Sequence, residues 1–297
     1  MSLVLPAALE PRVRRGEPMS RHTTWHAGGP AEAWFVPQDV ADLAGFLRAL
    51  PPEVPVTWVG LGSNLLVRDG GIRGVVISLH GALNALERVD ETTLRAEAGV
   101  PCARIARQCG RWEIGPAEFF AGIPGTLGGA LAMNAGAWGG ETWRHVAEVE
   151  TVDRAGTLRR RAAGEYSVGY RSVVPPAPGE WFVAATLRFG PHAGGADAIR
   201  GLLERRLAAQ PIGAWSCGSV FTNPPGDHAA RLIEAAGLKG YRVGDAEVST
   251  KHANFIVNLG KARAADLEAV IRHVQETVER VHGVRLSTEV RILGDAA

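Results

Sequence analysis

The sequence is poor in the residues that define several functional classes. It holds 3 cysteines among 297 residues, and Cys102, Cys109 and Cys217 lack metal-ligand spacing. The histidines form neither an HExxH motif nor a paired ligand pattern, so we expect no metal. An odd number of cysteines is most simply explained by reduced thiols, which predicts a cytoplasmic protein.

Excess charge and long apolar runs are also lacking. Lysine and arginine number 32 against 31 aspartate and glutamate, so no nucleic-acid partner is predicted. No apolar run reaches membrane length, and the N-terminus lacks the charged segment and apolar core of a signal peptide. We therefore expect a globular chain of two or three domains with no membrane partner.

Glycine, by contrast, is abundant. Seven glycines fall between Gly122 and Gly140, interleaved with side chains that favour burial, such as Ile123, Leu127 and Trp138. Glycine permits positive φ and lets backbone amides approach a ligand closely. A segment that is both apolar and glycine-rich therefore predicts a packed backbone that lies against a flat or anionic ligand.

A second glycine loop, Gly60 to Leu65, follows a strand-like run. It is not a dinucleotide-binding fingerprint, because Leu65 occupies the sixth position and a strand, not a helix, is predicted next. A tight turn explains the loop alone. Taken with the later glycine segment, it predicts instead a split site for a phosphate and a ring.

Hydrophobic periodicity predicts short strands that alternate with helices. We expect helices at 40–50, 101–109, 197–209, 227–236 and 266–282, and strands at 34–36, 56–59, 75–79, 94–98, 146–152, 157–160, 181–189 and 284–293. Asp227 is predicted to cap one helix, and Gly110, Gly237 and Gly283 to end three. Residues 1–20 are predicted to be a loose arm, and 190–195 a domain boundary.

Three short segments carry residues suited to chemistry. They are Gly169 to Ser172, Cys217 to Pro224 and Thr288 to Arg291. Each also has an ordinary explanation: a stacked Arg–Tyr pair, a turn and a solvated strand face. Ser219 lacks the nucleophile elbow of serine hydrolases. The alternation over 284–293 turns Glu289 away from the core.

Read together, the motifs GLGSNLLV, AGIPGTLGGALAMNAGAWGGE, GYRS, GSVFTNP, KHANFIVN and LSTEVRILG resemble the UDP-N-acetylenolpyruvoylglucosamine reductase family of bacterial cell-wall synthesis. The resemblance covers about residues 21–294 and favours the shorter subtype, because no extra loop separates Tyr170 from the strand at Trp181. It implies an α+β fold of the vanillyl-alcohol-oxidase (PCMH) type. Two FAD-binding subdomains, 1–80 and 81–192, would precede a substrate-binding domain, 193–297.

The resemblance also implies the cofactors and the residues around them. FAD would bind non-covalently, NADPH would reduce it, and the protein would act as a monomer. The residues implied to hold FAD lie in the two glycine segments: Gly60, Gly62, Ser63, Asn64, Leu65, Gly122, Ile123, Pro124, Gly125, Gly128, Gly129, Asn134, Ala135 and Gly136.

The family's catalytic residues align with Arg171, Ser219 and Glu289, and its substrate contacts with Tyr170, Asn223, Lys251 and His252. The implied reaction reduces the enolpyruvyl group of a UDP-sugar to a lactyl ether. Two family lysines are missing, at Ala209 and Thr222. Two alternatives stay open: an oxidase or dehydrogenase of alcohols or sugar lactones, and a non-catalytic sensor of cell-wall precursors.

Overall fold

The computed structural model describes residues 3–297 and divides the chain into two compact units. Unit 1 comprises the described part of 1–14 together with 33–61 and 74–205, and unit 2 comprises 15–32, 62–73 and 206–297. Each unit is therefore built from separate stretches of chain. The three-part division into 1–80, 81–192 and 193–297 stays a prediction.

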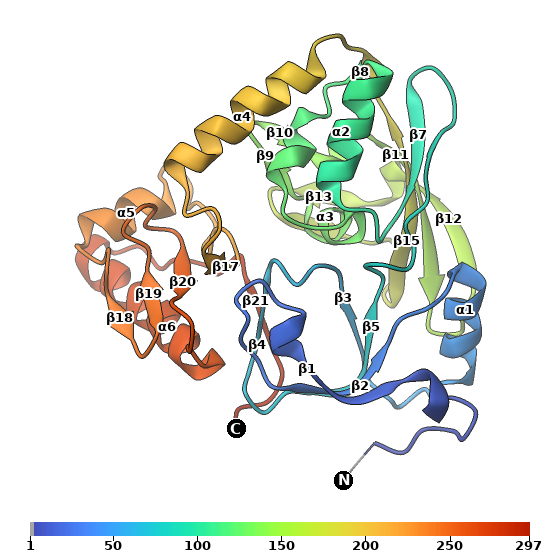
Figure 1. Cartoon of the computed structure of the whole chain (residues 1–297), viewed down its shortest axis with the longest axis horizontal. Coiled ribbons are helices and arrows are strands. Elements are labelled where there is room, and N and C mark those ends of the chain that lie inside the picture. Colours follow the sequence, from blue (N-terminus) through green and yellow to red (C-terminus); the bar gives the residue numbers. More distant parts are fainter. Residues whose placement is uncertain (1–2) are drawn as a thin grey trace. The chain divides into compact units, whose positions relative to one another are not determined.

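Unit 1 contains most of the strands (Figure 1). Its helices are η1 (Glu10–Arg12), α1 (Val40–Ala49), α2 (Cys102–Trp112), η3 (Glu118–Gly122), α3 (Leu127–Met133), η4 (Thr142–Arg144), η5 (Ala163–Glu165) and most of α4 (Gly195–Ala209). Its strands are β3 (Val56–Val59), most of β5 (Ile72–Ser78), β6 (Leu86–Arg88), β7 (Thr93–Glu97), β8 (Ile114–Gly115), β9 (Gly136–Ala137), β10 (Gly140–Glu141), β11 (Val146–Asp153), β12 (Leu158–Ala162), β13 (Ser167–Gly169), β14 (Ser172–Val174), β15 (Glu180–Arg188) and β16 (Gly190–Pro191).

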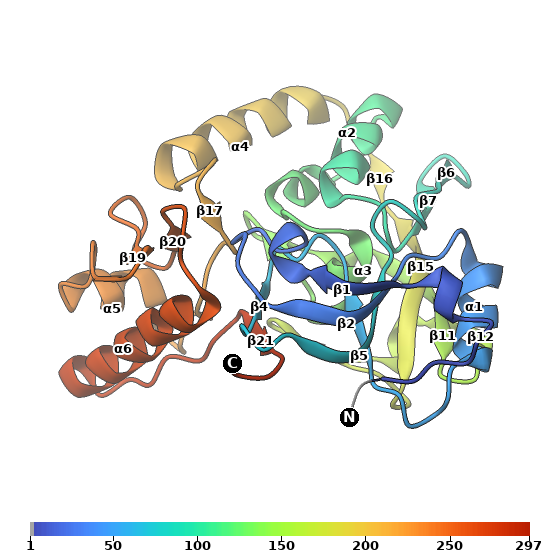
Figure 2. The ribbon, with the colours of Figure 1, turned by 60° about the horizontal axis from the view of Figure 1, so that its bottom comes forward.

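The centre of unit 1 is a five-stranded antiparallel sheet in the order β12-β11-β15-β7-β6. The helix α3 lies against β7 and β15, and α2 packs on η3 (Figures 1 and 2). One buried cluster fills the space between these helices and the sheet, and a second lies under α1, where Phe35 and Phe46 stack at 3.8 Å. The strand β3 pairs in parallel with β5.

The helix α2 was predicted correctly from its hydrophobic periodicity, but its end was predicted wrongly from a single glycine. Cys102, Ile105, Ala106 and Cys109 are all buried along one face of the helix, and the helix predicted at 101–109 is confirmed. The predicted end at Gly110 is wrong, because the helix continues to Trp112 and stops at Glu113 in the left-handed conformation (φ 55°). A glycine inside a helix weakens it without ending it when the packed face continues.

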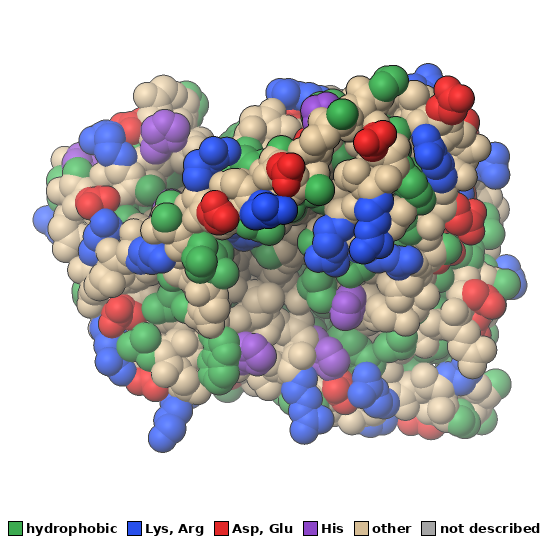
Figure 3. Space-filling model, turned by 45° about the horizontal axis from the view of Figure 1, so that its top comes forward, with side chains coloured by type: hydrophobic (Ala, Val, Ile, Leu, Met, Phe, Trp, Pro, Cys, Tyr) green, Lys and Arg blue, Asp and Glu red, His purple; other side chains and the backbone are tan. Residues whose placement is uncertain are grey.

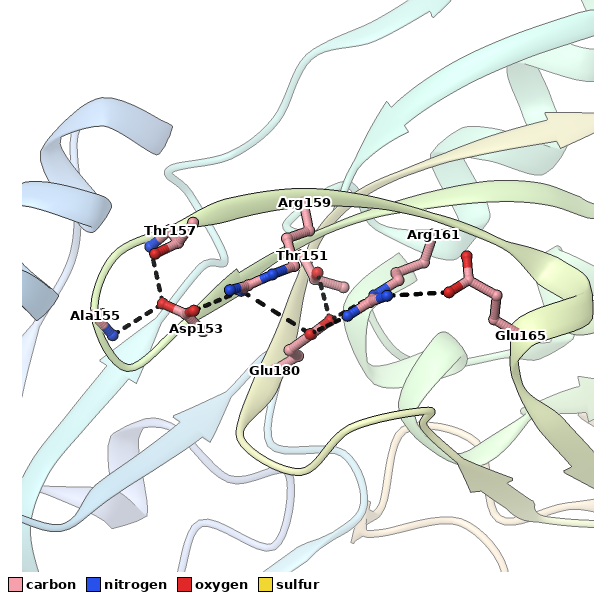
Figure 4. A network of polar contacts seen from close by, with 8 residues as sticks. All are labelled: Thr151, Asp153, Ala155, Thr157, Arg159, Arg161, Glu165 and Glu180. Atoms are coloured by element: carbon pink, nitrogen blue, oxygen red, sulfur yellow. Dashed lines mark hydrogen bonds and ion pairs between the residues drawn. The ribbon is translucent and has the colours of Figure 1, made fainter.

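A polar network spans three strands of the sheet in unit 1 (Figure 4). The Glu180 side chain on β15 is only 4% exposed and accepts hydrogen bonds from Arg161 Nη2 (2.7 Å) and Thr151 Oγ1 (2.9 Å). Arg159 approaches the same carboxylate at 4.0 Å, and Arg161 also contacts Glu165 at 3.0 Å. The hydrogen bond from Arg161 holds the pKa of Glu180 below its ordinary value.

We expect Glu180→Gln to lower the free energy of unfolding by about 2 kcal/mol at about pH 7, because the variant loses the carboxylate that two arginines face. A lowered folded-state pKa stabilises the protein above the ordinary carboxyl pKa, and this contribution vanishes as pH falls through the lowered value. The difference from wild type should therefore shrink in acid. Urea unfolding at several pH values measures it.

The matched control for this variant is Glu148→Gln. Glu148 pairs with Arg160 at 3.9 Å on the same sheet, but both side chains are well exposed. Exposed pairs contribute little, so this change should stay within about 0.5 kcal/mol of wild type at every pH. Equal losses for the two variants would contradict the role assigned to Glu180.

Unit 2 is the smaller unit. Its helices are η2 (Met19–Arg21), α5 (Ala229–Ala235) and α6 (Ala264–His282). Its strands are most of β1 (Arg14–Pro18), the first half of β2 (Pro30–Phe35), β4 (Leu65–Val67), β17 (Trp215–Ser216), β18 (Arg242–Val243), β19 (Ala246–Val248), β20 (Ile256–Asn258) and β21 (Arg291–Leu293).

A sheet in the order β17-β20-β19-β18 packs against α6 and forms the core of unit 2. On α6 the side chain of Val281 in the last turn is 49% exposed, whereas five apolar positions before it are buried: Leu267, Val270, Ile271, Val274 and Val278. Gly283 ends the helix at φ 68°, as predicted. The strand β21 pairs in parallel with β4, which joins the C-terminal segment to the loop that starts at Gly60.

Three predictions about unit 2 and the N-terminus are wrong. The strand over 284–293 is reduced to β21, although Leu286 and Val290 are buried as the alternation requires. Asp227 is not the cap of α5, because His228 occupies that position. The arm is not loose, since η1 and β1 form within it and Leu9 is 2% exposed. Its first two residues lie outside the described part of the chain.

The face drawn in Figure 3 carries acidic and basic side chains intermixed, in keeping with a net charge of +1. Across residues 3–297, no helix is both long and apolar enough to cross a membrane.

Candidate functional site

The loop after β3 leads into another strand, as predicted, and it is built around Gly62. Gly62 is buried at φ 63°, and a Cβ there would lie 1.9 Å from the carbonyl oxygen of His22. Only glycine fits both the conformation and the space. Within the described chain, the amides of Leu61, Gly62 and Ser63 donate to no other group of the protein.

Such amides are suited to an anion. Buried backbone amides are nearly always hydrogen-bonded, yet Gly62 is buried and its amide has no acceptor among the described residues of the protein. With the half-buried Leu61 and Ser63 on either side, the loop offers three consecutive N–H groups that could cradle phosphate oxygens. The residues present thus fit the pyrophosphate of a dinucleotide cofactor such as FAD.

The segment from Gly122 to Gly136 uses its glycines in a different way. A Cβ at Gly122 would lie 2.6 Å from Ala137 Cβ, and a Cβ at Gly128 would lie 3.0 Å from Ala98 Cβ. The amides of Leu127 and Gly128 donate to the carbonyls of residues 100 and 98. The glycines at 122 and 128 therefore serve close packing within unit 1, and the predicted cofactor contacts of the segment stay a prediction.

The two glycine segments meet at Thr126. A Cβ at Gly60 would lie 2.6 Å from Thr126 Oγ1, so Gly60 and the start of α3 are in contact within unit 1. This supports a site assembled from both segments. Thr126 was not predicted; its place before an apolar helical run, typical of an N-cap residue, was the available signal.

Arg171 lies at the tip of the hairpin formed by β13 and β14. It adopts the left-handed conformation (φ 53°), and its guanidinium lies 5.1 Å from the centre of the Tyr170 ring. Nη1 donates to the carbonyl of Asn134 (3.2 Å) and Nη2 to that of Gly136 (3.1 Å). The stacked pair is therefore present, but the guanidinium is also anchored to the second glycine segment.

Hydrogen bonds within unit 2 bring the segments of three predicted site residues, Asn64, Ser219 and Glu289, together. The Glu289 amide donates to the Val220 carbonyl (2.8 Å), which places Glu289 beside the residue that follows Ser219. Asn64 Nδ2 donates to the Glu289 carbonyl (3.1 Å), and the Arg291 amide donates to the Asn64 carbonyl (3.0 Å). A residue of the first glycine loop thus fixes the segment that carries Glu289.

The cysteines do not provide a reactive thiol. All three are buried. Burial raises the pKa of Cys109 to about 12 and raises those of Cys102 and Cys217 as well. The thiolate is the nucleophilic form, so these groups are inert near neutral pH. Among residues 3–297, no three His, Cys, Asp or Glu side chains could hold a metal ion.

The remaining predicted contacts are all in unit 2. Asn223 Oδ1 accepts from the Ala229 amide (3.1 Å) and so helps to cap α5, the role predicted for Asp227. Lys251 Nζ donates to the Leu207 carbonyl in the last turn of α4 (2.6 Å). Burial lowers the pKa of His252, so it is neutral near pH 7. Their contacts with a substrate stay a prediction.

Arg171 and Tyr170 belong to unit 1, whereas Ser219 and Glu289 belong to unit 2. Each unit positions its own residues by the hydrogen bonds above. The convergence of Arg171, Ser219 and Glu289 on one ligand stays a prediction.

Comparison with known proteins gives matches along nearly the whole chain. Residues 31–161 match the FAD binding domain family, and residues 210–293 match "UDP-N-acetylenolpyruvoylglucosamine reductase, C-terminal domain". The UDP-N-acetylenolpyruvoylglucosamine reductase of Alkalilimnicola ehrlichii is 60% identical over 96% of this chain and 95% of its own length. The reductase of that name from Methylococcus capsulatus is 57% identical, over 94% and 92%.

A solved structure agrees with these matches. The crystal structure of UDP-N-acetylenolpyruvylglucosamine reductase from Thermus caldophilus has a TM-score of 0.81 to this chain and is 33% identical. The similarity covers 95% of this chain and 99% of the other. It confirms the α+β fold expected from the sequence.

Proposed function

The chain belongs to the UDP-N-acetylenolpyruvoylglucosamine reductase family, and from this premise we propose that it reduces UDP-N-acetylglucosamine enolpyruvate to UDP-N-acetylmuramate with NADPH. The product is a precursor of peptidoglycan. The reaction adds a hydride to the terminal carbon of the enolpyruvyl group and a proton to the neighbouring carbon.

FAD is the cofactor of this reaction, and the first glycine loop suits its pyrophosphate. The amides of Leu61, Gly62 and Ser63 would donate to the phosphate oxygens, and the segment from Gly122 to Gly136 would lie along the ring. When bound, FAD carries the hydride between NADPH and the substrate.

Arg171 would hold the substrate carboxylate. Hydride addition pushes negative charge into that group, and a planar guanidinium can pair with it through two parallel hydrogen bonds. The bonds from Nη1 and Nη2 to two backbone carbonyls support this role, because they fix the plane of the guanidinium before substrate arrives.

Ser219 would deliver the proton, and Glu289 would help to stabilise the enolate-like anion that hydride addition creates. A serine hydroxyl is a weak acid, so this role requires a strongly basic carbanion and a polarised hydroxyl. The observation that carries the proposal is the bond from the Glu289 amide to the Val220 carbonyl, which holds the serine and the glutamate on adjacent backbone.

The two alternatives make different predictions. An oxidase with histidine-linked flavin would keep its yellow colour on the polypeptide after acid denaturation, whereas the proposed FAD dissociates. A sensor would bind the enolpyruvyl sugar nucleotide without turnover. The presence of arginine, serine and glutamate at the three family positions favours the enzyme. The shorter subtype, the monomeric state and the cytoplasmic location remain part of the proposal.

The proposal is tested with flavin-loaded protein in two steps under anaerobic conditions. NADPH should bleach the flavin absorption, and the enolpyruvyl sugar nucleotide should then restore it with formation of the lactyl ether. A flavin that NADPH reduces but that the substrate leaves reduced would exclude the reductase function.

A further inference from the structure

Arg171 occupies an unfavourable position for an arginine. It is not glycine, yet it adopts φ 53° at the tip of a hairpin whose strands have three residues each. Left-handed backbone disfavours side chains with a Cβ, and a short two-stranded hairpin is marginally stable by itself. Such a conformation persists only where the surroundings impose it.

Asn134 provides that constraint. Its Nδ2 donates to the carbonyl of Gly169 (3.0 Å), the last residue of β13, and its own carbonyl accepts from Arg171 Nη1 (3.2 Å). One residue therefore holds both the backbone of the hairpin just before its tip and the guanidinium that the tip carries.

Asn134 is itself held rigidly. It is 2% exposed, ends α3 at φ 47°, and its Oδ1 accepts from the Trp143 amide (3.1 Å). The Trp143 indole donates to the Leu131 carbonyl within α3 (2.8 Å). Asparagine is among the few residues that tolerate the left-handed conformation. Its amide also supplies the donor and the acceptor that these two contacts require.

We propose that Asn134 is a positioning residue that sets the orientation of the Arg171 guanidinium. This inference rests on the proposed function, since Arg171 matters for turnover only if it holds the substrate carboxylate. The side chain of Asn134 is used inside the protein, so its part in the site is to align the arginine rather than to reach the cofactor.

The test variant is Asn134→Gly, which keeps the left-handed backbone and removes both side-chain bonds. We expect substrate-driven reoxidation of the reduced flavin to slow by about 10- to 100-fold, because small misplacements of a binding group have effects of this order. Because Asn134 lies in the segment proposed to run along the flavin ring, both half-reactions are measured per bound FAD. Flavin reduction by NADPH should then fall by a smaller factor than reoxidation, as expected when mainly a substrate-facing group is disturbed.

The matched control is Glu113→Gly. Glu113 ends α2 in the same left-handed conformation (φ 55°), and its amide donates to Cys109 as a helix cap should. Within the described residues, the backbone of Glu113 makes no hydrogen bond to the hairpin. Both half-reactions should stay at wild-type rates in this variant, which separates a change of helix cap from the loss of the Asn134 amide.

A second readout does not depend on turnover. The Nε–H resonance of Arg171, identified by its loss in Arg171→Lys, should report an ordered side chain in wild type and a mobile one in Asn134→Gly. If Asn134→Gly does not fold, Asn134→Asp serves, because a carboxylate keeps the acceptor for Trp143 and loses the donor to Gly169.

The inference would be overturned if the Arg171 side chain stayed ordered in the Asn134 variant. It would also be overturned if the variant reoxidised its flavin with substrate as fast as an active wild type does. A wild type without substrate-driven reoxidation would instead refute the proposed function. The resonance would still decide whether Asn134 orders the arginine.

Discussion

Ser219→Ala is expected to leave flavin reduction by NADPH intact and to slow reoxidation by the enolpyruvyl sugar nucleotide by about 100-fold or more. Loss of a proton donor in the transition state has effects of this size, and the first half-reaction does not need that donor. Stopped-flow absorbance of the flavin measures the two half-reactions separately.

The structure indicates that Ser219→Ala removes only the hydroxyl and leaves the neighbouring backbone contacts intact. Ser219 precedes Val220, whose carbonyl accepts from the amides of Glu289 and Val290, and alanine at 219 leaves those bonds in place. Ser216→Ala, in β17, is the matched hydroxyl control and should change neither half-reaction. Equal loss of both half-reactions in Ser219→Ala would show that the serine is structural instead.

Gly62→Ala is expected to yield protein that has lost most of its FAD and is less stable by about 3 kcal/mol, from the left-handed backbone plus overpacking. The added methyl group would lie 1.9 Å from the His22 carbonyl oxygen, so backbone must move. That movement would displace the three amides proposed to hold the pyrophosphate. The flavin-to-protein absorbance ratio and urea unfolding measure both effects.

Gly16→Ala separates the two causes. Gly16 lies in β1 at φ 62°, nearly the same as Gly62, but a Cβ there would meet no atom within 4 Å. It should lose only about 1 kcal/mol, the expected effect of the left-handed conformation alone, and keep its flavin. If Gly62→Ala retained flavin as Gly16→Ala does, the cradle at 61–63 would have to be abandoned.

Much of the local structure could be predicted because it depends on short-range periodicity. The apolar stripes of α2 and α6 follow from residues three and four apart, and the end of α6 at Gly283 follows from the freedom of glycine at positive φ. The strand-to-strand character of the loop at Gly60 was predictable for the same reason, since its flanking runs are strand-like.

The errors occur where distant packing overrides a local signal. Gly110 lies on a helix that continues to Trp112, a half-buried side chain that packs against the core of unit 1, so the helix stops only at Glu113. Of the predicted last strand, only Arg291–Leu293 forms a strand, paired with β4, while Thr288 makes an isolated bridge to Phe221. No pattern within 284–293 indicates where the pairing with β4 begins. No local pattern indicates that Lys251 donates to the Leu207 carbonyl, 44 positions away in the sequence, and the contact of Lys251 with a substrate stays a prediction.

The amino-acid sequence by itself determined the family, the cofactor class and the candidate residues, because glycine loops and short polar motifs consist of residues that are adjacent in the sequence. Tertiary structure alone decided how those residues are held. Asn134 meets Gly169 and Asn64 meets Glu289 only after segments far apart in the chain have packed, since hydrogen bonds of this kind depend on distance in space and not on order in sequence.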